Sequence, residues 1–370
     1  MVYCYIILVT LNDCRRQEFS VTAYTAVTII KPAVNFDREY NGRNRESPEG
    51  DMSQQIETDA GQELKNCMLC PRKCGVDRTA GQTGYCASFA AMRVARASLH
   101  MWEEPCISGS EGSGTVFFTG CSLRCRFCQN AEISAGIRRP SPGIEVTPEE
   151  LADIFLNLQK QGANNINLVT AGHFIVPCAK ALKTAKERGL TVPVVYNSSG
   201  YELPESLRFL DGLVDIYLPD LKFMDPELAR SCCGAPDYPE TARKAIHEMV
   251  RQIETRFGEG AQFDERGIMT HGVIVRQLLL PGHVRDAKDA VSYLHRTYQN
   301  RIWISMMSQY TPMAAVRGDP LLKRKVTKRE YERLIDYALS IGVEHAFIQE
   351  TGAAVEDYIP AFDAESIRSI

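Results

Sequence analysis

The chain has no run of about 20 apolar residues, which is the length that a helix needs to cross a bilayer. It also has no excess of positive charge, because it contains 42 Lys and Arg residues and 46 Asp and Glu residues, which gives a net charge of −4. The composition therefore gives no reason to expect binding to a membrane or to nucleic acid. The apolar start, residues 1–11, lacks the basic leader and the clean cleavage site of a secretory signal peptide.

The 370 residues, of which 44% are hydrophobic and 24% are charged, suit one large α/β domain with an appendage. The first 51 residues read differently from the rest, and residues 41–51 have the polar composition of a linker. Two interpretations of residues 1–51 stay open. They are either a disordered extension or a mis-assigned start, with Met52 as the native first residue.

Cysteine is abundant, with 13 residues in the chain. Seven of them fall in two compact groups with metal-type spacing, which indicates a reducing, cytoplasmic compartment and not a disulfide framework. We predict that Cys106 is a small buried hydrophobe and that the vicinal pair Cys232 and Cys233 consists of incidental thiols. The cysteines outside the two groups are Cys4, Cys14, Cys106, Cys178, Cys232 and Cys233.

One group consists of Cys121, Cys125 and Cys128, spaced C-x3-C-x2-C directly after the apolar, strand-like run 115–120. Three thiolates on one short loop can hold three irons of a cubane cluster, and the fourth iron then has no protein ligand in that loop. Such an open position lets a cofactor bind and receive an electron. A structural zinc, which favours a closed set of four ligands, fits a trio poorly, and it remains an alternative together with simple buried thiols.

With Phe127 in the aromatic position, this loop resembles the C-x3-C-x-aromatic-C pattern of radical S-adenosylmethionine (SAM) enzymes. The resemblance implies a [4Fe-4S] cluster on Cys121, Cys125 and Cys128, with SAM bound at its unique iron. In that family one electron from the cluster cleaves SAM to methionine and a 5′-deoxyadenosyl radical, which abstracts a hydrogen atom. We expect an oxidoreductase-type enzyme of this kind.

The other group consists of Cys67, Cys70, Cys74 and Cys86, with a Gly-rich turn at 81–84 before the last cysteine. Four thiolates within twenty residues can close around one metal, and the glycines let the backbone fold tightly enough to deliver the last ligand. Metal binding would supply much of the folding energy of this segment, about 10 kcal/mol for a structural zinc. A second iron–sulfur cluster, a zinc ion and four unligated thiols all stay open, and the role could be electron relay, substrate docking or stapling.

The run 94–114, the four-cysteine group and the pair Gln129 and Asn130 after the second group together resemble one branch of this family. It is the PflX-type branch, which is related to pyruvate formate-lyase activating enzyme. The resemblance extends from Cys67 to the C-terminus and leaves residues 1–51 unexplained.

Downstream, helical and strand patterns alternate, beginning with the capping-box sequence 147–150. Six strands that alternate with helices predict a parallel sheet with right-handed crossovers. The resemblance implies an open, partial (β/α)6 TIM-like barrel, so the predicted organisation is a cysteine-rich metal-binding segment at 52–110 followed by a barrel at 111–370. The expected strands are 115–119, 165–170, 192–196, 214–218, 272–280 and 302–306, with a short addition at 347–349, and the expected helices are 177–188, 205–210, 239–257, 286–298 and 328–341.

In such barrels the chemistry lies on the loops at the carboxyl ends of the strands. Thr170 stands where the family often has a carboxylate for the SAM amino group, and this chain has none there, so Thr170 and backbone carbonyls must serve. Asp220 and Lys222 match an Asp-x-Lys of the activating enzymes and could bind a SAM hydroxyl or ammonium and the SAM carboxylate. The full set of predicted cofactor-binding residues is Phe127, Gln129, Asn130, Thr170, Asn197, Ser199, Asp220 and Lys222.

Other polar residues near the strand ends carry weaker signals. We predict that His283 and Arg276 are structural, and His173 is either a satisfied loop histidine or a functional contact. An ordinary surface ion pair is the alternative for Asp220 and Lys222. No catalytic residue is assigned.

Three functions stay open. The first is a radical SAM enzyme of unassigned substrate, and the second is an activase that makes a glycyl radical on a partner enzyme. The position of the four-cysteine group before the barrel counts against the second function, whereas the Asp220–Lys222 match favours it. The third is a non-enzymatic metal or iron–sulfur scaffold. The family implies SAM and an electron donor such as flavodoxin or ferredoxin as partners.

Overall fold

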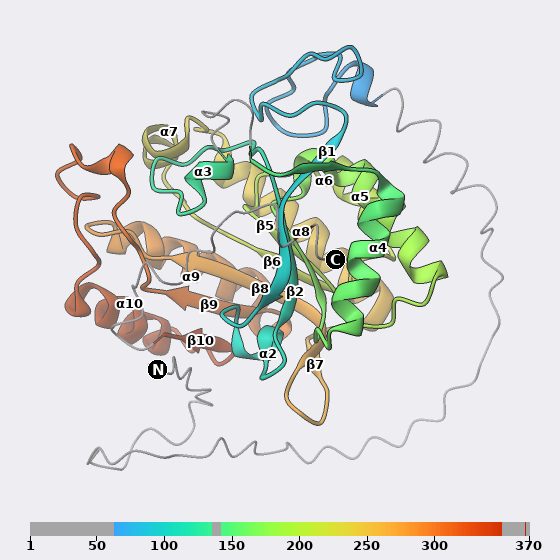
Figure 1. Cartoon of the computed structure of the whole chain (residues 1–370). Coiled ribbons are helices and arrows are strands. Elements are labelled where there is room, and N and C mark those ends of the chain that lie inside the picture. The colour runs from blue at the N-terminus through green and yellow to red at the C-terminus, as the bar shows by residue number, and fades with distance from the viewer. Residues whose placement is uncertain (1–62, 135–141, 350–366, 368–370) are drawn as a thin grey trace.

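The computed structural model describes residues 63–134, 142–349 and 367. The expectation for residues 1–51 lies outside the described residues. Within the described ranges, a parallel sheet runs from β2 through β10, and helices cover its outer face (Figure 1). The parallel strands are β2 (Ser113–Phe118), β4 (Ile166–Val169), β5 (Val194–Ser198), β6 (Ile216–Pro219), β8 (Met269–Leu278), β9 (Trp303–Met307) and β10 (Ala346–Ile348).

The predicted fold class, an α/β partial barrel, is confirmed. The strands pair in the spatial order β10-β9-β8-β6-β5-β4-β2, each parallel to its neighbour, as right-handed crossovers through helices require. The order agrees with the six predicted strands and their short C-terminal addition. The helices that follow the strands are α4 (Pro148–Lys160), α5 (Ile175–Glu187), α6 (Pro204–Leu207), α8 (Tyr238–Phe257), α9 (Val284–Tyr298) and α10 (Lys328–Ser340).

Several elements were not predicted. The strand β1 (Met92–His100) pairs antiparallel with β2, and β3 (Ile144–Val146) pairs antiparallel with β1. Two arginines and small residues interrupt the apolar pattern of β1, so its strand conformation follows from its partner and not from its own sequence. The other additions are α2 (Pro105–Ser108), α3 (Ala131–Ser134), α7 (Pro226–Cys233) and β7 (Gln262–Phe263).

The strands have two distinct faces because successive side chains point to opposite sides. On β5, Val194 and Tyr196 pack in the main core with the helices, whereas Val195 belongs to a second apolar cluster with Leu218 of β6 and Trp303 of β9. This second cluster fills the lower part of the lumen of the barrel, together with Cys106 and Ile107 of α2. Cys106 is therefore the buried small hydrophobe that the sequence predicted.

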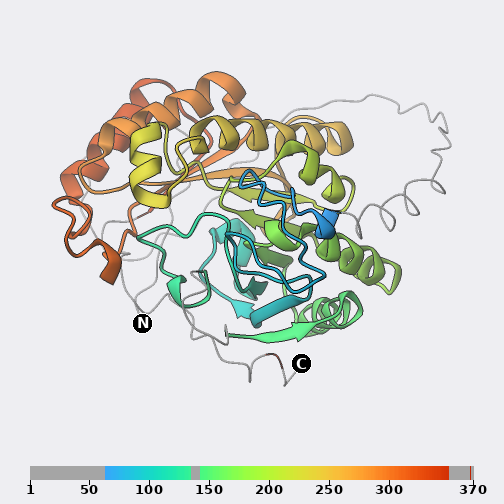
Figure 2. The same cartoon turned by 90° about the horizontal axis from the view of Figure 1, so that it is seen from above.

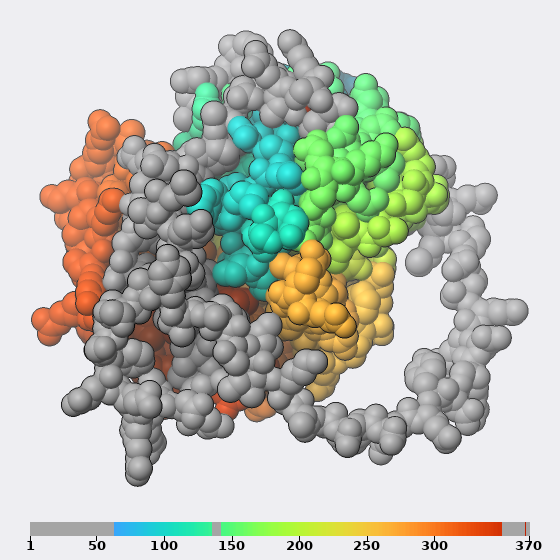
Figure 3. Space-filling view, turned by 60° about the horizontal axis from the view of Figure 1, so that its bottom comes forward, coloured from blue at the N-terminus to red at the C-terminus, as the bar shows by residue number. Residues whose placement is uncertain are grey.

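The α2 segment occupies the end of the barrel away from the strand-end loops. Figure 3 brings that end forward and shows the chain around α2 beside the hairpin formed by β7 and β8. An ion pair between Arg266 and Glu111 (3.7 Å) joins the two. The α2 segment and the β7–β8 hairpin thus both lie at the lower end of the barrel.

The cysteine-rich loops lie at the opposite end (Figure 2, blue). They cover the side of the barrel on which the loops after the parallel strands emerge. The Arg78 side chain is buried there, and Nη1 donates to the carbonyl of His173 (2.6 Å) in the loop after β4. No helix in the described ranges is both long and apolar enough to cross a membrane.

The start of α4 tests the predicted local signals. Thr147 accepts a hydrogen bond from the Glu150 amide (3.1 Å), and the Glu150 carboxylate accepts one from the Thr147 amide (2.8 Å), which confirms the capping box. We expect Thr147→Ala to lower the free energy of unfolding by about 1 kcal/mol, because the Glu150 amide loses its side-chain acceptor. Chemical denaturation measures this difference. Thr297→Ala, at an exposed position inside α9, is the control and should not destabilise the chain; equal effects of the two substitutions would contradict the capping role.

Candidate functional site

The loop that carries Cys121, Cys125 and Cys128 joins β2 to α3 at the mouth of the barrel. Cys121 is buried and the other two are half-buried. Polar hydrogens point at two of the sulfurs, because the Leu123 amide contacts Cys121 Sγ at 3.4 Å and the Ser134 hydroxyl contacts Cys128 Sγ at 3.4 Å. Arg124 adopts a positive φ of 54°, which an L-residue takes only when the surroundings hold it there.

The residues of this loop fit an iron–sulfur cluster by the chemistry of the donor set. They offer three soft sulfur ligands on one short loop and hydrogen-bond donors that stabilise sulfur in its thiolate form. Within residues 63–134, 142–349 and 367, no group of three or more His, Cys, Asp or Glu side chains is arranged to hold a metal ion. In the metal-free chain, burial raises the pKa of Cys121 to about 12, so cluster binding must displace protons from the thiols.

The aromatic residue of the motif, Phe127, points into the protein. Its ring lies 6.1 Å from that of Phe223 and 5.8 Å from that of Tyr310, measured between centroids. The Tyr310 hydroxyl donates in turn to the Leu322 carbonyl (2.7 Å). The aromatic position therefore anchors the loop to the hydrophobic core between Cys125 and Cys128.

Gln129 and Asn130 extend the loop toward other strand ends. The Gln129 amide donates to the carbonyl of Gln309, after β9, at 3.4 Å. The Asn130 carbonyl accepts from the amides of Ile133 and Ser134 at 3.2 and 3.0 Å and so starts α3. Both residues are half-buried beside Cys128.

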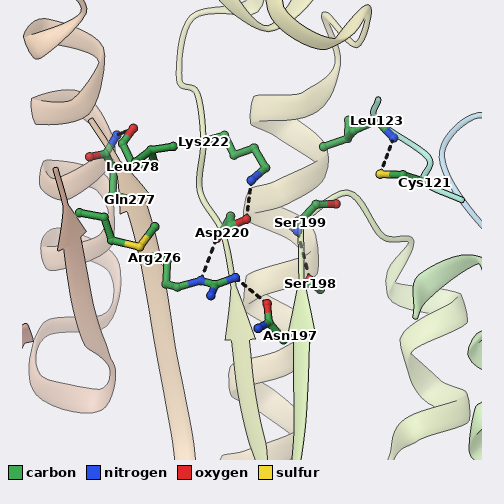
Figure 4. Close-up of polar contacts among 12 residues, drawn as sticks. Cys121, Leu123, Asn197, Ser198, Ser199, Asp220, Lys222, Arg276, Gln277 and Leu278 are labelled. Atoms are coloured by element: carbon green, nitrogen blue, oxygen red, sulfur yellow. Dashed lines mark hydrogen bonds and ion pairs between the residues drawn. The ribbon is translucent and has the colours of Figure 1, made fainter. Parts of the chain in front are cut away.

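A network of buried charges crosses the lumen just below the loop (Figure 4). Arg276 of β8 donates from Nε to Asp220 (2.9 Å) and from Nη2 to the Asn197 side-chain oxygen of β5 (2.5 Å). A weaker contact joins Arg276 Nη1 to Glu103 (3.4 Å), whose other oxygen accepts from Asn197 Nδ2 (3.4 Å). Arg276 was predicted to be structural, and it stands at the centre of this network.

Asp220 and Lys222 form an ion pair that is largely shielded from solvent, with side chains 13% and 17% exposed. Burial alone would raise the pKa of Asp220, but the positive charges of Arg276 and Lys222 outweigh it and lower that pKa. Burial would lower the pKa of Lys222, but Asp220 outweighs it and raises that pKa. The alternative of an ordinary surface ion pair therefore does not describe this pair.

Tyr238 positions both ends of the Asp220–Lys222 turn. The Tyr238 hydroxyl of α8 lies within hydrogen-bond distance of two carbonyl acceptors, those of Ser199 (2.8 Å) and Asp220 (2.9 Å). The same hydroxyl accepts a hydrogen bond from the Lys222 amide (3.0 Å). Gly200 permits this close passage, because a Cβ there would lie 2.2 Å from the Asp220 carbonyl oxygen. The loops after β5 and β6 thus form one unit.

The remaining predicted cofactor residues lie at the same rim. Thr170 has a positive φ of 60°, and its amide donates to the Asn197 carbonyl (2.9 Å). Ser199 is half-buried in the next loop. Strand pairing thus brings Thr170, Asn197 and Ser199 together with Asp220, although they are far apart in the sequence.

His173 lies behind this rim and does not reach the lumen network. Its ring is buried, and Nε2 contacts the Thr119 carbonyl at 2.9 Å. Burial and the nearby Arg78 charge lower the pKa of His173 to about 3, so the imidazole is neutral. The ring supports the strand that leads into the Cys121 loop.

Sequence reasoning missed three carboxylates, of which Glu104 and Glu202 are buried and Glu103 is half-buried. Glu103 and Glu104 enter the lumen from the chain between β1 and α2, and burial raises the pKa of each. Glu202, in the loop after β5, accepts from the Ser198 hydroxyl (3.0 Å) and lies against Gly172 on the side facing the helices. The run that contains Glu103 and Glu104 was visible in the sequence, but only the fold places it inside the barrel.

The four-cysteine group shares one pocket, although its side chains are not set for metal coordination in the metal-free chain. Cys67, Cys70, Cys74 and Cys86 line one small pocket, and His173 forms part of its wall. Burial raises the pKa of Cys70 to about 12, and the three neighbouring thiols add to the shift. The Tyr85 amide points at Cys74 Sγ (3.3 Å).

The vicinal cysteines lie at the end of α7 beside the Cys121–Cys128 loop. The Cys232 carbonyl accepts from the Arg126 amide (2.9 Å), and the Cys233 thiol contacts both Cys125 and the Ala229 carbonyl (3.1 Å). The two thiols were predicted to be incidental. Their backbone supports the Cys121–Cys128 loop through the contact with Arg126.

Comparison with known proteins finds a family match over part of the chain. Residues 115–257 match the family model of the Radical SAM superfamily. Residues 115–257 are therefore similar to the radical SAM domain. This match confirms the predicted superfamily and covers the Cys121–Cys128 loop and the strands β4 to β6.

Relatives and solved structures extend the comparison. The chain is 27% identical over 279 residues to the uncharacterized protein MJ0674 of Methanocaldococcus jannaschii, covering 74% of this chain and 75% of that protein. Similar structures include a domain of pyruvate-formate lyase-activating enzyme from Bacteroides vulgatus (15% identity, 45% of this chain, 86% of that chain, TM-score 0.32). They also include Streptococcus suis SuiB bound to S-adenosylmethionine (13% identity, 60% of this chain, 46% of that chain, TM-score 0.40).

The position of Glu202 leads to a pH-dependent prediction. Burial raises the pKa of Glu202 to about 7, above the value of about 4.3 in an unfolded chain. The folded state therefore keeps the Glu202 proton up to a higher pH than the unfolded state does. The contribution of this proton to the free energy of unfolding is fully present below pH ~4.3 and is lost as the pH rises to about 7. We expect Glu202→Gln, relative to wild type, to gain about 2–3 kcal/mol of unfolding free energy between pH ~5 and pH ~8.

Urea denaturation of the metal-free chain at the two pH values measures this gain. Glu205→Gln, at an exposed position in α6, is the matched control and should keep the pH profile of the wild type. Parallel profiles of Glu202→Gln and wild type would show that Glu202 is not held protonated by burial.

Proposed function

We propose that the chain is a radical SAM enzyme that binds a [4Fe-4S] cluster through Cys121, Cys125 and Cys128. The observation that carries the proposal is that this loop follows β2 at the same end of the parallel sheet as the network of Asn197, Asp220, Lys222 and Arg276. When bound, the cluster and SAM supply an electron and a 5′-deoxyadenosyl radical for hydrogen abstraction. The substrate is unassigned.

The polar residues of the rim supply the contacts that SAM requires. Lys222 lies near Cys125, as their mutual effect on pKa indicates, and its ammonium can pair with the SAM carboxylate. Asp220 contacts Arg276 and Lys222 through different oxygens, and each oxygen keeps a lone pair for a ribose hydroxyl or an ammonium. Asn197, Ser199, Thr170, Gln129 and Asn130 add amide and hydroxyl groups.

We propose the domain boundaries that the sequence predicted. A cysteine-rich segment at 52–110 precedes a barrel at 111–370, and the segment contributes β1 to the sheet and α2 to the lower end of the lumen. An anaerobic cytoplasm and a low-potential donor such as flavodoxin or ferredoxin suit this chemistry, because a radical is quenched by oxygen.

A second candidate is an activase for a glycyl radical enzyme. The observation that favours it is the Asp220–Lys222 pair at a strand end beside the cluster loop. A partner would have to present a glycine loop to the mouth of the barrel, which requires rearrangement on binding. Incubation with a candidate glycyl radical enzyme and SAM should yield a glycyl radical signal on that enzyme, whereas cleavage of SAM without such a signal would favour another substrate.

The proposal predicts the outcome of anaerobic reconstitution with iron and sulfide. After dithionite reduction, electron paramagnetic resonance should show a cubane signal that shifts on addition of SAM, and 5′-deoxyadenosine should form. Cys125→Ala should lose the shift and the product, because an iron loses its thiolate ligand.

Cys178→Ala, which removes a fully buried thiol in α5, is the matched control and should keep both readouts. A fully iron-loaded wild type that shows no SAM-sensitive signal would instead support the non-enzymatic scaffold.

The lumen network gives a separate prediction for SAM affinity. Arg276→Lys keeps the charge but loses the fork that reaches Asn197 and Asp220 together. We expect the Kd for SAM to rise about tenfold, or ~1.4 kcal/mol, with iron content unchanged. Isothermal titration of the reconstituted protein measures the change.

Arg301 offers a matched control at the surface, because its Nη1 contacts both Glu254 oxygens at 2.9 and 3.0 Å. Arg301→Lys should leave SAM binding intact. Equal SAM affinity in Arg276→Lys and wild type would show that the network does not position SAM.

A further inference from the structure

We propose that Cys67, Cys70, Cys74 and Cys86 bind a second metal centre, and that this centre braces the Cys121–Cys128 loop. Metal binding by the four thiols does not depend on the proposed function. The bracing effect rests on it, because it assumes a cluster in the Cys121–Cys128 loop.

The pocket is lined by sulfur ligands. Four cysteines that are separated by up to nineteen positions line the same pocket. The donor set is purely sulfur, which selects a thiophilic centre, either zinc or an iron–sulfur cluster. The Tyr85 amide directed at Cys74 Sγ is the kind of donor that stabilises a metal-bound thiolate.

The backbone is shaped around the sulfurs. A Cβ at Gly84 would lie 2.7 Å from Cys74 Sγ, so only glycine lets the returning chain pass over this ligand. Lys73 and Ala87 have positive φ values of 42° and 58°, and each is adjacent to a cysteine of the group. Such conformations cost free energy and persist only where the surroundings impose them.

The segment around the four cysteines also has almost no regular secondary structure. Between the described start of the chain and β1 there is one short helical turn at 63–65 and no strand. Backbone hydrogen bonds, such as Cys67 amide to Val76 carbonyl (3.0 Å) and Gly75 amide to Cys67 carbonyl (3.0 Å), order it together with the side chains of Arg72 and Arg78. A metal that joins four points of such a segment adds to its folding energy.

The segment is also connected to the Cys121–Cys128 loop. Arg72, between Cys70 and Cys74, donates to three carbonyls across the mouth of the barrel, those of Ser122 (2.9 Å), Cys233 (2.9 Å) and Gly234 (2.6 Å). Tyr85, next to Cys86, donates to the Leu123 carbonyl at 3.3 Å. The positions of Arg72 and Tyr85 thus link the four-thiol centre to the backbone around Cys121.

Two further contacts tighten the connection. The ring of Tyr85 lies under the guanidinium groups of Arg72 (3.9 Å) and Arg124 (4.8 Å), and Arg124 directly precedes Cys125. His173 forms part of the pocket wall and contacts Thr119 just before the loop. Loss of the four-thiol centre would therefore release both sides of the Cys121–Cys128 loop.

The test of metal binding uses a full-length variant with Cys121, Cys125 and Cys128 all changed to Ala, which leaves only the four-thiol centre. After anaerobic expression and purification, we expect about one zinc, or about four iron with matching sulfide, per chain. Either metal supports the site and identifies the centre. A folded variant that binds neither metal above the level of a chain lacking all seven cysteines would overturn it.

The test of bracing uses the double variant Cys70→Ala/Cys74→Ala. If the proposed function holds, this variant still shows a SAM-sensitive signal, but we expect at least a twofold loss of iron in the Cys121–Cys128 loop. Hydrogen exchange at residues 121–128 should be faster than in wild type. Unchanged exchange and iron content would overturn the bracing role without affecting the proposed function.

Arg72→Gln separates the brace from the metal. It should keep the metal of the four-thiol centre and still increase hydrogen exchange at residues 121–128. Arg230→Gln, which loses one exposed ion pair to Glu227 in nearby α7, is the matched control and should behave as wild type. If Arg72→Gln leaves that exchange unchanged, the link through Arg72 is wrong.

Discussion

The arrangement of the site depends on the interaction of the Asp220 carboxylate with two cations, Arg276 and Lys222. A buried carboxylate is costly unless cations and hydrogen bonds surround it, and removing one partner leaves an uncompensated charge. Arg276 and Lys222 provide those partners from two directions, one from inside the lumen and one from the rim. Because Arg276 also contacts Asn197 and Glu103, this one charge fixes the relative positions of β5, β6, β8 and the chain before α2.

This constraint explains why the polar site can exist inside an apolar barrel. The lower lumen is filled by an apolar cluster that includes Val195, Leu218 and Trp303, and the polar network lies directly above it. Apolar side chains surround the network from below, so the charges act in a medium of lower polarity where their interactions are stronger. The cysteine-rich segment covers the opposite end, and its contacts with the Cys121–Cys128 loop make it part of the site.

Much of the fold followed from local sequence signals. The six parallel strands and the start of α4 at Thr147 were predicted, because β-branched runs and the capping box act over a few residues. The strand β1 was not predicted, because its conformation comes from pairing with β2 and not from its own pattern. The short helix α7 was also missed, although Asp225 caps its start and Gly234 ends it in a left-handed conformation.

The site was predictable to the extent that its residues follow strands or belong to motifs. The cysteines, Asp220 and Lys222 belong to motifs, and Asn197 and Thr170 follow strands. The central role of Arg276 could not be read from the sequence, because the side of a strand that faces the lumen depends on register. Glu103 and Glu104 were missed for a different reason, since only the folding of α2 into the barrel brings them there.

The measurement that tests the central claim most directly is electron–nuclear double resonance of the reduced, reconstituted protein with SAM labelled with nitrogen-15 in its amino group. The account predicts a hyperfine coupling between that nitrogen and the cluster held by Cys121, Cys125 and Cys128, because the loop leaves one iron open to SAM. The same label should give no coupling in Cys125→Ala. A fully loaded wild-type cluster without any coupling to the labelled nitrogen would contradict the account.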